Sequence, residues 1–349
     1  MVASREVSSR TSSAPEVNDP SALRKRAAAA ALIGAVIAGA IVLASSRGHV
    51  ADMTRGDGQI YQYVAANLGR APQDVHPVVR ERGTSLRYGR IGLPVTIWVV
   101  SAGQPSAMPY TQPLIMLAAA AAASAAAALL LPGAGPLAPI LPFVAPGFSL
   151  SIAGGYAEAL GVALALWAVV FALRRRWGWC AVMLAWAILT RENTTAILVG
   201  IAAWMIWRGS TKSVPVIAAS LVPVAGWWVF VKQRFGYIPP LDPYLREQTN
   251  TVGTPGVALV QSFTDAASGR AAAMAAFHVG LAVAAIALAR RSLFGLIATV
   301  LSLQVIVSGP FAWRFIGEAA RTGVFLQLFV ALALVAWRRP QWADPASIA

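Results

Sequence analysis

The chain has 349 residues, of which 57% are hydrophobic and only 12% are charged, and its mean hydropathy is +0.63. A soluble domain would carry about 25% charged residues, so the composition argues against a water-soluble protein and predicts an all-α, polytopic membrane protein. The net charge of +14 does not indicate nucleic-acid binding, because no basic cluster alternates with stacking aromatic residues. Arginines at helix ends that face anionic lipid account for it.

Residues 1–23 are rich in Ser, Pro and charge, which predicts a disordered cytoplasmic tail. Residues 24–339 form one polytopic membrane domain in this interpretation, and residues 340–349 form a second short cytoplasmic tail. The first apolar run, 27–46, is longer than the apolar region of a signal peptide and directly follows Arg24, Lys25 and Arg26. These features favour an uncleaved transmembrane helix. A signal peptide is the alternative, because Ala44-Ser45-Ser46 loosely resembles a cleavage site.

The apolar runs predict about ten transmembrane helices. The candidate spans are residues 27–46, 88–103, 111–131, 155–173, 177–190, 196–207, 214–231, 270–289, 293–309 and 322–337. By the positive-inside rule, the basic turns at 24–26, 174–176, 208–212, 290–291 and 338–339 are cytoplasmic. Ten crossings satisfy all five turns and place both termini in the cytoplasm, provided that the Pro- and Gly-rich segment 135–153 does not cross on its own.

Residues 177–207 must also form a hairpin with residues 190–193 at its outer tip. The alternative is one long helix that buries Arg191 and Glu192 at mid-membrane, which costs about 2.5–3.5 kcal/mol per charge. The hairpin is therefore the favoured prediction.

The first outer loop, 47–87, contains a carboxylate between two glycines, in the string Arg55-Gly56-Asp57-Gly58-Gln59-Ile60-Tyr61. Glycines permit a tight turn and a close approach of other groups, so Asp57 is a candidate catalytic residue. An ordinary Asp-Gly turn is the alternative. Apolar residues then recur at helical spacing, which predicts an interfacial helix at about 59–69.

Arg87 and Arg90 open the second span, where two guanidinium groups match the oxygens of a lipid phosphate. Interfacial snorkelling of the two arginines is the alternative. Glu158 lies near the outer end of the span 155–173, where a lone acid indicates either a functional role or neutralisation of an outer arginine.

Two further charged strings interrupt apolar sequence at predicted outer helix ends. They contain Arg191 and Glu192 in one case, and Arg314, Glu318 and Arg321 in the other. Each string carries both signs of charge, so ion pairing within the string is the main alternative to substrate binding. If the topology holds, all of these strings meet on one face of the membrane. The scattered histidines lack ligand spacing, so the sequence predicts no metal site and no cofactor.

Together these strings resemble a known family. Asp57-Gly58-Gln59-x-Tyr61 after the first span, followed by Arg87-Tyr88-x-Arg90-Ile91-x-Leu93-Pro94, resembles the C-type (GT-C) membrane glycosyltransferases. More narrowly, it resembles bacterial mannosyltransferase-like members that lack a soluble domain. Leu189-Thr190-Arg191-Glu192 and Glu318-x-x-Arg321 are similar to motifs of those proteins.

The resemblance implies a polyprenyl-phosphate sugar as donor, an unidentified glycan or lipid acceptor, and an inverting transfer in the cell envelope, with the active site on the outer face of the plasma membrane. It implies that Asp57 is the general base. It also implies that Arg87 and Arg90, or Arg314 and Arg321, neutralise the phosphate leaving group, with Gln59, Tyr61, Glu158, Arg191, Glu192 and Glu318 as further substrate-binding candidates. The family often has two adjacent acids in this loop, whereas here the nearest second acid is Asp52.

Two other functions stay open. A lipid or solute transporter would place ionisable groups at mid-membrane, whereas the predicted spans are nearly free of charge. A non-catalytic GT-C homologue is compatible with the missing adjacent acid.

Overall fold

The computed structural model describes residues 20–54, 56–68, 88–236, 238, 256–264, 269–289, 292–307 and 316–338, and every regular element in these ranges is helical. In chain order the α-helices are α1 (Pro20–Ser46), α2 (Asp57–Ala66), α5 (Gly92–Val100), α6 (Met108–Leu130), α7 (Leu141–Val144), α8 (Pro146–Gly154), α9 (Ala157–Leu173), α10 (Trp177–Thr190), α11 (Thr195–Trp207), α12 (Val214–Ala218), α13 (Leu221–Phe235), α15 (Val257–Thr264), α16 (Gly269–Leu288), α17 (Leu293–Val307), α19 (Ile316–Thr322) and α20 (Val324–Trp337). The 3-10 helices are η1 (Val50–Asp52), η3 (Pro105–Ala107), η4 (Pro132–Ile140), η5 (Glu192–Thr194) and η6 (Thr211–Ser213). The all-α prediction is therefore confirmed for this part of the chain.

Large apolar side chains cover the outside of the molecule. Leu32 and Val36 of α1, Val222 of α13 and Ile286 of α16 are between 62% and 69% exposed. Among the described residues, three helical stretches are long and apolar enough to cross a bilayer, namely Ser21–Ser46, Pro105–Leu130 and Thr211–Arg234, and several shorter apolar helices accompany them. Such surfaces are stable against lipid and not against water, so the helices are those of a membrane protein.

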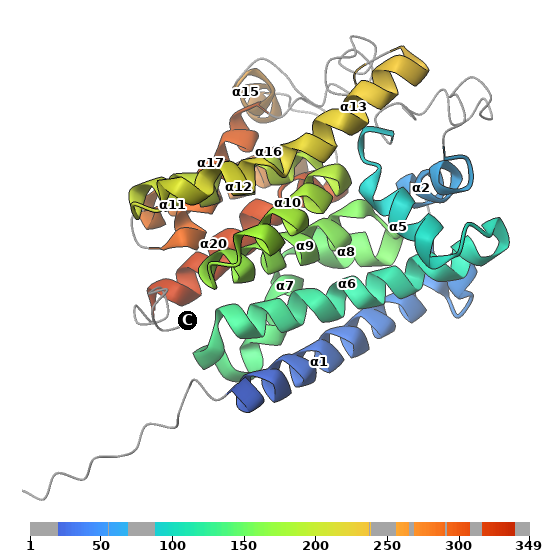
Figure 1. Cartoon of the computed structure of the whole chain (residues 1–349), viewed down its shortest axis with the longest axis horizontal. Helices are drawn as coiled ribbons and strands as arrows, with labels where there is room; N and C mark the ends of the chain where they lie inside the picture. Colours follow the sequence, from blue (N-terminus) through green and yellow to red (C-terminus); the bar gives the residue numbers. More distant parts are fainter. Residues whose placement is uncertain are drawn as a thin grey trace, which may run out of the picture.

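Helices α1 and α6 pack closely because small residues line their contact (Figure 1). Ala30 and Ala38 of α1 are buried, and Gly34 lies between them at the same four-residue spacing. A Cβ atom at Gly34 would overlap Ser124 and the Ala120 carbonyl of α6. This four-residue spacing of small residues is a common way to bring two membrane helices together. It makes α1 a packed part of the helical domain, and the helix begins at Pro20, so residues 20–23 are helical where a disordered tail was predicted.

The bundle has two chemically different ends. One end, which we name the acidic end, holds every acidic residue that the structure describes: Asp52, Asp57, Glu158, Glu192 and Glu318. The opposite, basic end holds the described parts of the predicted cytoplasmic turns, at residues 24–26, 174–176, 208–212 and 338. Arg26 Nη1 donates to the Pro132 carbonyl at this end, 2.5 Å away. The charge pattern that the sequence predicts is therefore present in the fold.

The fold differs from the predicted set of crossings at two segments, and the two differences compensate. In the run 88–103, a turn at residues 90–91 separates the helical residues 88 and 89 from α5. The nine residues of α5 give about 14 Å of helix, which cannot span a core about 30 Å thick. Gly92, at the start of α5, lies against Thr190 at the acidic end, and Gln112, near the start of α6, donates to Gly155 at the same end. The chain therefore enters α5 and leaves for α6 from one end.

The segment that was predicted not to cross runs along α6 from the basic end of the bundle to the acidic end. It leaves α6 at Leu131, passes Ser124, whose hydroxyl donates to the Pro139 carbonyl at 2.7 Å, and reaches Gly155 beside Gln112. Residues 132–144 and 146–154 are two helical parts bent by 64°. Together they return along α6, whose 23 residues correspond to about 34 Å. Five prolines interrupt this segment, so a search of the sequence for continuous apolar helices does not find it as a span.

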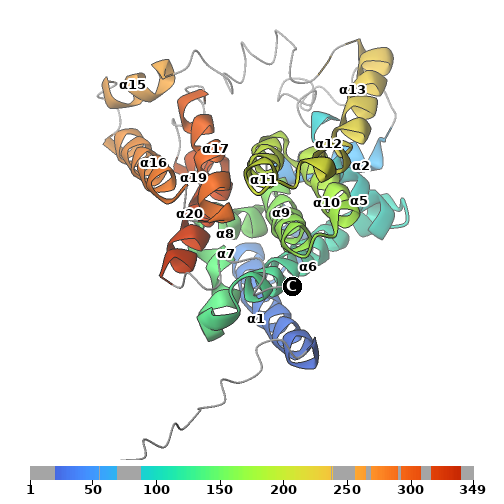
Figure 2. The same cartoon turned by 60° about the vertical axis from the view of Figure 1, so that its left-hand side comes forward.

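The break between α10 and α11 falls where the hairpin prediction put it. Arg191 has an extended conformation, with φ −149° and ψ 115°, and separates α10 from η5 and α11. The alternative of one continuous helix is therefore wrong. Figure 2 shows α9 to α13 as one group, α15, α16, α17, α19 and α20 as a second, and α1, α6 and α7 below both. Gly200 of α11 packs against Ile297 of α17 where the two groups meet.

Candidate functional site: a charged cluster at the acidic end

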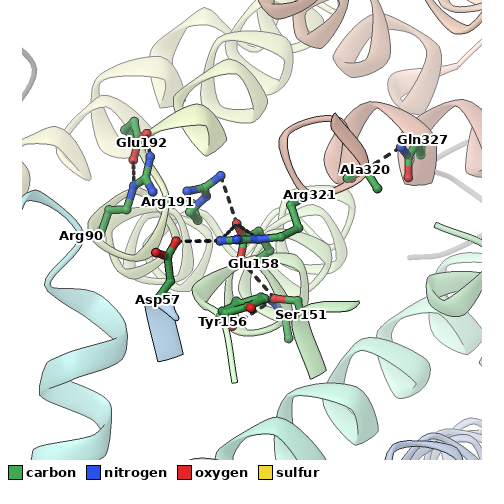
Figure 3. Close-up of polar contacts among 11 residues, drawn as sticks. Asp57, Arg90, Ser151, Tyr156, Glu158, Arg191, Glu192, Ala320, Arg321 and Gln327 are labelled. Carbon is green, nitrogen blue, oxygen red and sulfur yellow. Dashed lines mark hydrogen bonds and ion pairs between the residues drawn. The ribbon is translucent and has the colours of Figure 1, made fainter. Parts of the chain in front are cut away.

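Six charged residues from distant parts of the chain meet at the acidic end (Figure 3). They are Asp57 in the first turn of α2, Arg90 just before α5, Glu158 in the first turn of α9, Arg191 and Glu192 between α10 and α11, and Arg321 in α19. They carry three negative and three positive charges. The four charged strings that the sequence analysis singled out are thus all represented in one cluster.

Arg321 lies at the centre of this cluster. Its Nη2 is 3.1 Å from Asp57 Oδ2 and 3.0 Å from Glu158 Oε1, and its Nε donates to the same Glu158 oxygen at 3.2 Å. The guanidinium carbon lies 3.9 Å from the centre of the Tyr156 ring, which adds a cation–π contact. Arg321 therefore joins α2 to α9 through one side chain.

Glu158 is fully buried and forms ion pairs with two arginines. Besides Arg321, Arg191 Nη2 lies 3.1 Å from Glu158 Oε1. The second carboxylate oxygen accepts from the Ser151 hydroxyl at 3.2 Å, and that hydroxyl also accepts from the Ala159 N–H at 3.0 Å. A buried carboxylate with these partners keeps its charge because each oxygen is compensated.

Arg191 is the least engaged of the three arginines. Its side chain is only 7% exposed, and its Nε is buried without a hydrogen-bond partner among the described residues. An unmade hydrogen bond on a buried cation is costly, and such groups often lie where a ligand binds. This Nε is therefore a donor that an anion entering the cluster would satisfy.

Arg90 and Glu192 form a bidentate ion pair at the edge of the cluster. Arg90 Nε lies 2.8 Å from Glu192 Oε2 and Arg90 Nη2 lies 2.5 Å from Oε1. Arg90 is buried, whereas the Glu192 side chain is 46% exposed. The partial removal of Glu192 from water would by itself raise its pKa, but the charge and hydrogen bonds of Arg90 outweigh this and hold the pKa well below its ordinary value.

Glycines bring the backbone of α2 onto the neighbouring chain and so place Asp57. Gly56 has φ +52°, which a glycine adopts without strain, and it starts α2 so that Asp57 falls in the first turn. A Cβ at Gly58 would overlap the Gly154 carbonyl oxygen. Gln112, fully buried, donates to the carbonyls of Gly58 and Gly155 and holds the same contact from the α6 side.

Two other close glycine contacts set the positions of the arginines. A Cβ at Gly92 would overlap Thr190, so α5 lies directly against the residue before Arg191. A Cβ at Gly147 of α8 would overlap the carbonyl of Ala320, the residue before Arg321. In both places only a residue without a side chain lets the two segments approach this closely.

The remaining predicted site residues have different outcomes. Gln59 is exposed on α2, and Tyr61 is fully buried. Glu318 lies in α19, and its side chain is not among those that the structure describes. Arg87 and Arg314 lie outside the described residues. The helix predicted at about 59–69 is α2, which begins at Asp57, ends at Ala66 and buries one face in the protein.

Ion pairing was predicted correctly in kind, but the partners differ. Arg191 pairs with Glu158 and Glu192 pairs with Arg90, where pairing within each string was the expectation. Ser151, Tyr156 and Gln112 were not predicted as members of the site. Tyr156 follows the glycines beside Glu158, and Gln112 is a polar residue shortly before the alanine-rich run that begins at Ala118, so both left a signal in the sequence.

The described residues contain no group of three or more His, Cys, Asp or Glu side chains able to hold a metal ion. Asp52 is exposed in η1. No family model matches the chain, and no curated protein or solved structure is significantly similar to it. The cluster therefore has to be interpreted from its own geometry.

Proposed function

We propose that the chain is an inverting GT-C-type membrane glycosyltransferase that moves a sugar from a polyprenyl-phosphate donor to a glycan or lipid acceptor. The observation that carries the proposal is the contact of Asp57 with Arg321 beside the buried pair of Glu158 and Arg191. The Asp57 side chain is 18% exposed, whereas the two arginines are 7% exposed. An accessible carboxylate beside buried guanidinium groups is what transfer from a phosphate leaving group requires.

In this proposal Asp57 is the general base, and Arg321 and Arg191 bind the donor phosphate. The acceptor hydroxyl gives its proton to the Asp57 carboxylate as its oxygen bonds to the anomeric carbon of the sugar. The bond from that carbon to the phosphate oxygen breaks, and polyprenyl phosphate leaves with the electron pair. The guanidinium groups stabilise the charge that develops on the leaving phosphate.

The ion pair between Asp57 and Arg321 adds an order of events to this reaction. The donor phosphate competes with Asp57 for the same guanidinium, because both are anions and a guanidinium matches phosphate oxygens well. Once phosphate replaces it, Asp57 loses a counter-charge and becomes a stronger proton acceptor. The base is then activated only with donor in place. Arg90 is already engaged by Glu192, so it contributes less to phosphate binding than Arg191 does.

The same proposal includes a membrane orientation. Ten crossings are obtained when residues 132–154 replace 88–103 among the predicted spans, so both termini and the basic turns stay cytoplasmic. The acidic end then faces the outside of the plasma membrane. Lipid with a long polyprenyl tail has direct access to this end from the bilayer.

The balance of three carboxylates against three guanidinium groups favours one competing function, a structural ion network in a non-catalytic homologue. Buried pairs of this kind occur without catalysis. The transporter alternative gains less, because the cluster lies at helix ends at one end of the bundle and not along a path through it.

The test is the Asp57→Asn variant, which keeps the shape of the side chain and removes the basic carboxylate. Sugar transfer from radiolabelled polyprenyl-phosphate sugars in membranes that contain the protein should fall by about 10²–10⁴-fold. Asp52→Asn is the matched control, because Asp52 is an exposed acid in the same loop, and it should retain transfer. Transfer by Asp57→Asn near the level of the unaltered protein would leave the ion network as the better account.

A further inference from the structure

A second candidate binding site lies at the basic end, far from the charged cluster. An apolar cavity of about 260 Å³ opens there between η4, α7 and the end of α20. Its wall includes Leu131, Ala134, Leu137, Ala138, Val335 and Arg338. The cavity is apolar throughout except at Arg338, so it offers one positive charge at the edge of a hydrocarbon-like slot.

Among the residues that the structure describes, the charge around this cavity is of one sign. Arg26 lies beside it, held by its hydrogen bond to the Pro132 carbonyl, and Arg338 is exposed at the helix end. The acidic residues that the structure describes are all at the other end of the bundle, so these two guanidinium groups have no carboxylate of the described chain to pair with there. The complement of such a slot is a molecule with an apolar chain and an anionic head.

We propose that this cavity binds an anionic phospholipid of the surrounding membrane, with one acyl chain in the slot and the phosphate against Arg338 and Arg26. Basic pockets between membrane helices select anionic head groups, and a guanidinium fork fits phosphate oxygens. A water-soluble anion would leave the apolar wall uncovered, and a zwitterionic lipid would gain less from the two arginines.

A second cavity, of about 640 Å³, gives a built-in comparison. It lies at the same end and is lined by Ala203, Trp207, Ala289 and Leu296. None of these lining residues is charged. Arg208 follows Trp207 directly in the sequence, so this cavity serves as a control for cavity filling and not for head-group preference.

The lipid site rests on the membrane placement of the chain and not on the proposed sugar transfer. It nevertheless lies between two elements that reach the charged cluster. From the cavity, α7 and α8 lead to Ser151, and α20 leads back to α19 and Arg321. Helices α8 and α19 are in contact where Gly147 approaches Ala320.

The experiment uses the full-length protein in nanodiscs of equal parts phosphatidylglycerol and phosphatidylcholine, followed by native mass spectrometry of the lipids retained in detergent. The unaltered protein should retain phosphatidylglycerol in preference. Arg338→Gln should reduce this preference about fivefold, the effect of roughly one interfacial charge, and Arg338→Lys should keep most of it.

Cavity filling gives an independent arm. Ala134→Phe should abolish retention of the anionic lipid, whereas Ala203→Phe, which fills the larger uncharged cavity, should leave it unchanged. Size-exclusion profiles identify any variant that fails to fold, and Arg338→Gln alters an exposed side chain, so the test does not depend on the phenylalanine variants. Equal retention of both lipids by the unaltered protein, or an unchanged preference in Arg338→Gln, would overturn the proposal. No sugar enters the assay, so its outcome is separate from that of the transfer experiment.

Discussion

Single side chains in the cluster differ sharply in how much they depend on their partners. Glu158 is fully buried and faces two buried arginines, whereas Glu192 is half exposed and faces one. A buried ion pair adds little net stability as a pair, but removal of one member leaves an uncompensated charge away from water. Loss of Glu158 should therefore cost more stability than loss of Glu192.

Glu158→Gln should destabilise the protein by about 3–5 kcal/mol, because Arg191 and Arg321 would lose their shared counter-charge. Glu192→Gln is the comparison and should cost less, because it leaves one buried arginine, Arg90, without a counter-charge where Glu158→Gln leaves two, and because the Glu192 side chain is itself 46% exposed. The measurement is the denaturant midpoint of the purified protein in detergent micelles. Equal midpoints for the two variants would mean that Glu158 is not the buried centre of the network.

The residue types of this cluster could be predicted from the sequence, but their pairing could not. Charged strings in apolar sequence are conspicuous, and Asp57, Arg90, Glu158, Arg191, Glu192 and Arg321 were all singled out. Their partners are separated by 102 residues for Arg90 and Glu192 and by 264 for Asp57 and Arg321. Neighbours in sequence were the natural guess, yet the fold places the partners on different helices.

At the scale of elements, close backbone contacts decide where the arginines lie. Helix α8 can approach α19 only because Gly147 has no side chain at the Ala320 carbonyl. Gly58 makes the same kind of close backbone contact with Gly154, and Gly92 makes one with Thr190. These contacts give α2, α5 and α19 fixed distances from the rest of the bundle.

Gly147→Ala should lower stability by about 1–3 kcal/mol, the usual cost of overpacking, and should reduce sugar transfer further by moving Arg321. Gly39→Ala is the control, because Gly39 also lies in a helix but has open space around its missing Cβ. Alanine there should be neutral or stabilising by up to about 1 kcal/mol, through helix propensity alone. Thermal midpoints in detergent test both changes, and a Gly147→Ala midpoint at or above that of the unaltered protein would contradict the close contact.

Hydropathy gave good helix bounds where a helix is continuous and apolar. The predicted span 177–190 coincides with α10, and 196–207 differs from α11 by one residue. The hydropathy prediction failed for α5, because the helix ends at Val100 and residues 101–103 form a turn. It failed for residues 132–154, because prolines interrupt the helix. The hydropathy of a segment reflects the free energy of its transfer to lipid. It does not show whether the backbone of that segment continues as one helix.

At the scale of the whole molecule, the two differences from the predicted crossings change the membrane side of two loops, those at residues 104 and 137. All other loops stay on the side that the sequence predicts. Residue 104 lies at the acidic end and residue 137 at the basic end, whereas the sequence-based topology puts 104 inside and 137 outside. Gln104→Cys and Leu137→Cys, each in a Cys180→Ala background, separate the two arrangements. Cys180 is the single cysteine of the chain.

We expect an impermeant thiol reagent applied to intact cells to label position 104 and not position 137. His49→Cys, at an exposed position in the loop after α1, is the control that both arrangements place outside, and position 210 is the one that both place inside. Labelling of 137 but not 104 would restore the original set of spans and contradict the crossing by residues 132–154.

The broken crossing also has a consequence for biogenesis. Residues 132–154 contain prolines at five positions and a bend at Ala145, so several backbone groups lack helical partners. Two of the carbonyls are satisfied from outside the segment, Pro132 by Arg26 of α1 and Pro139 by Ser124 of α6. Unsatisfied backbone is costly in lipid, so this segment is a poor substrate for insertion by itself. We therefore expect this segment to insert only when α1 and α6 are already in the bilayer, where they supply the missing hydrogen-bond partners.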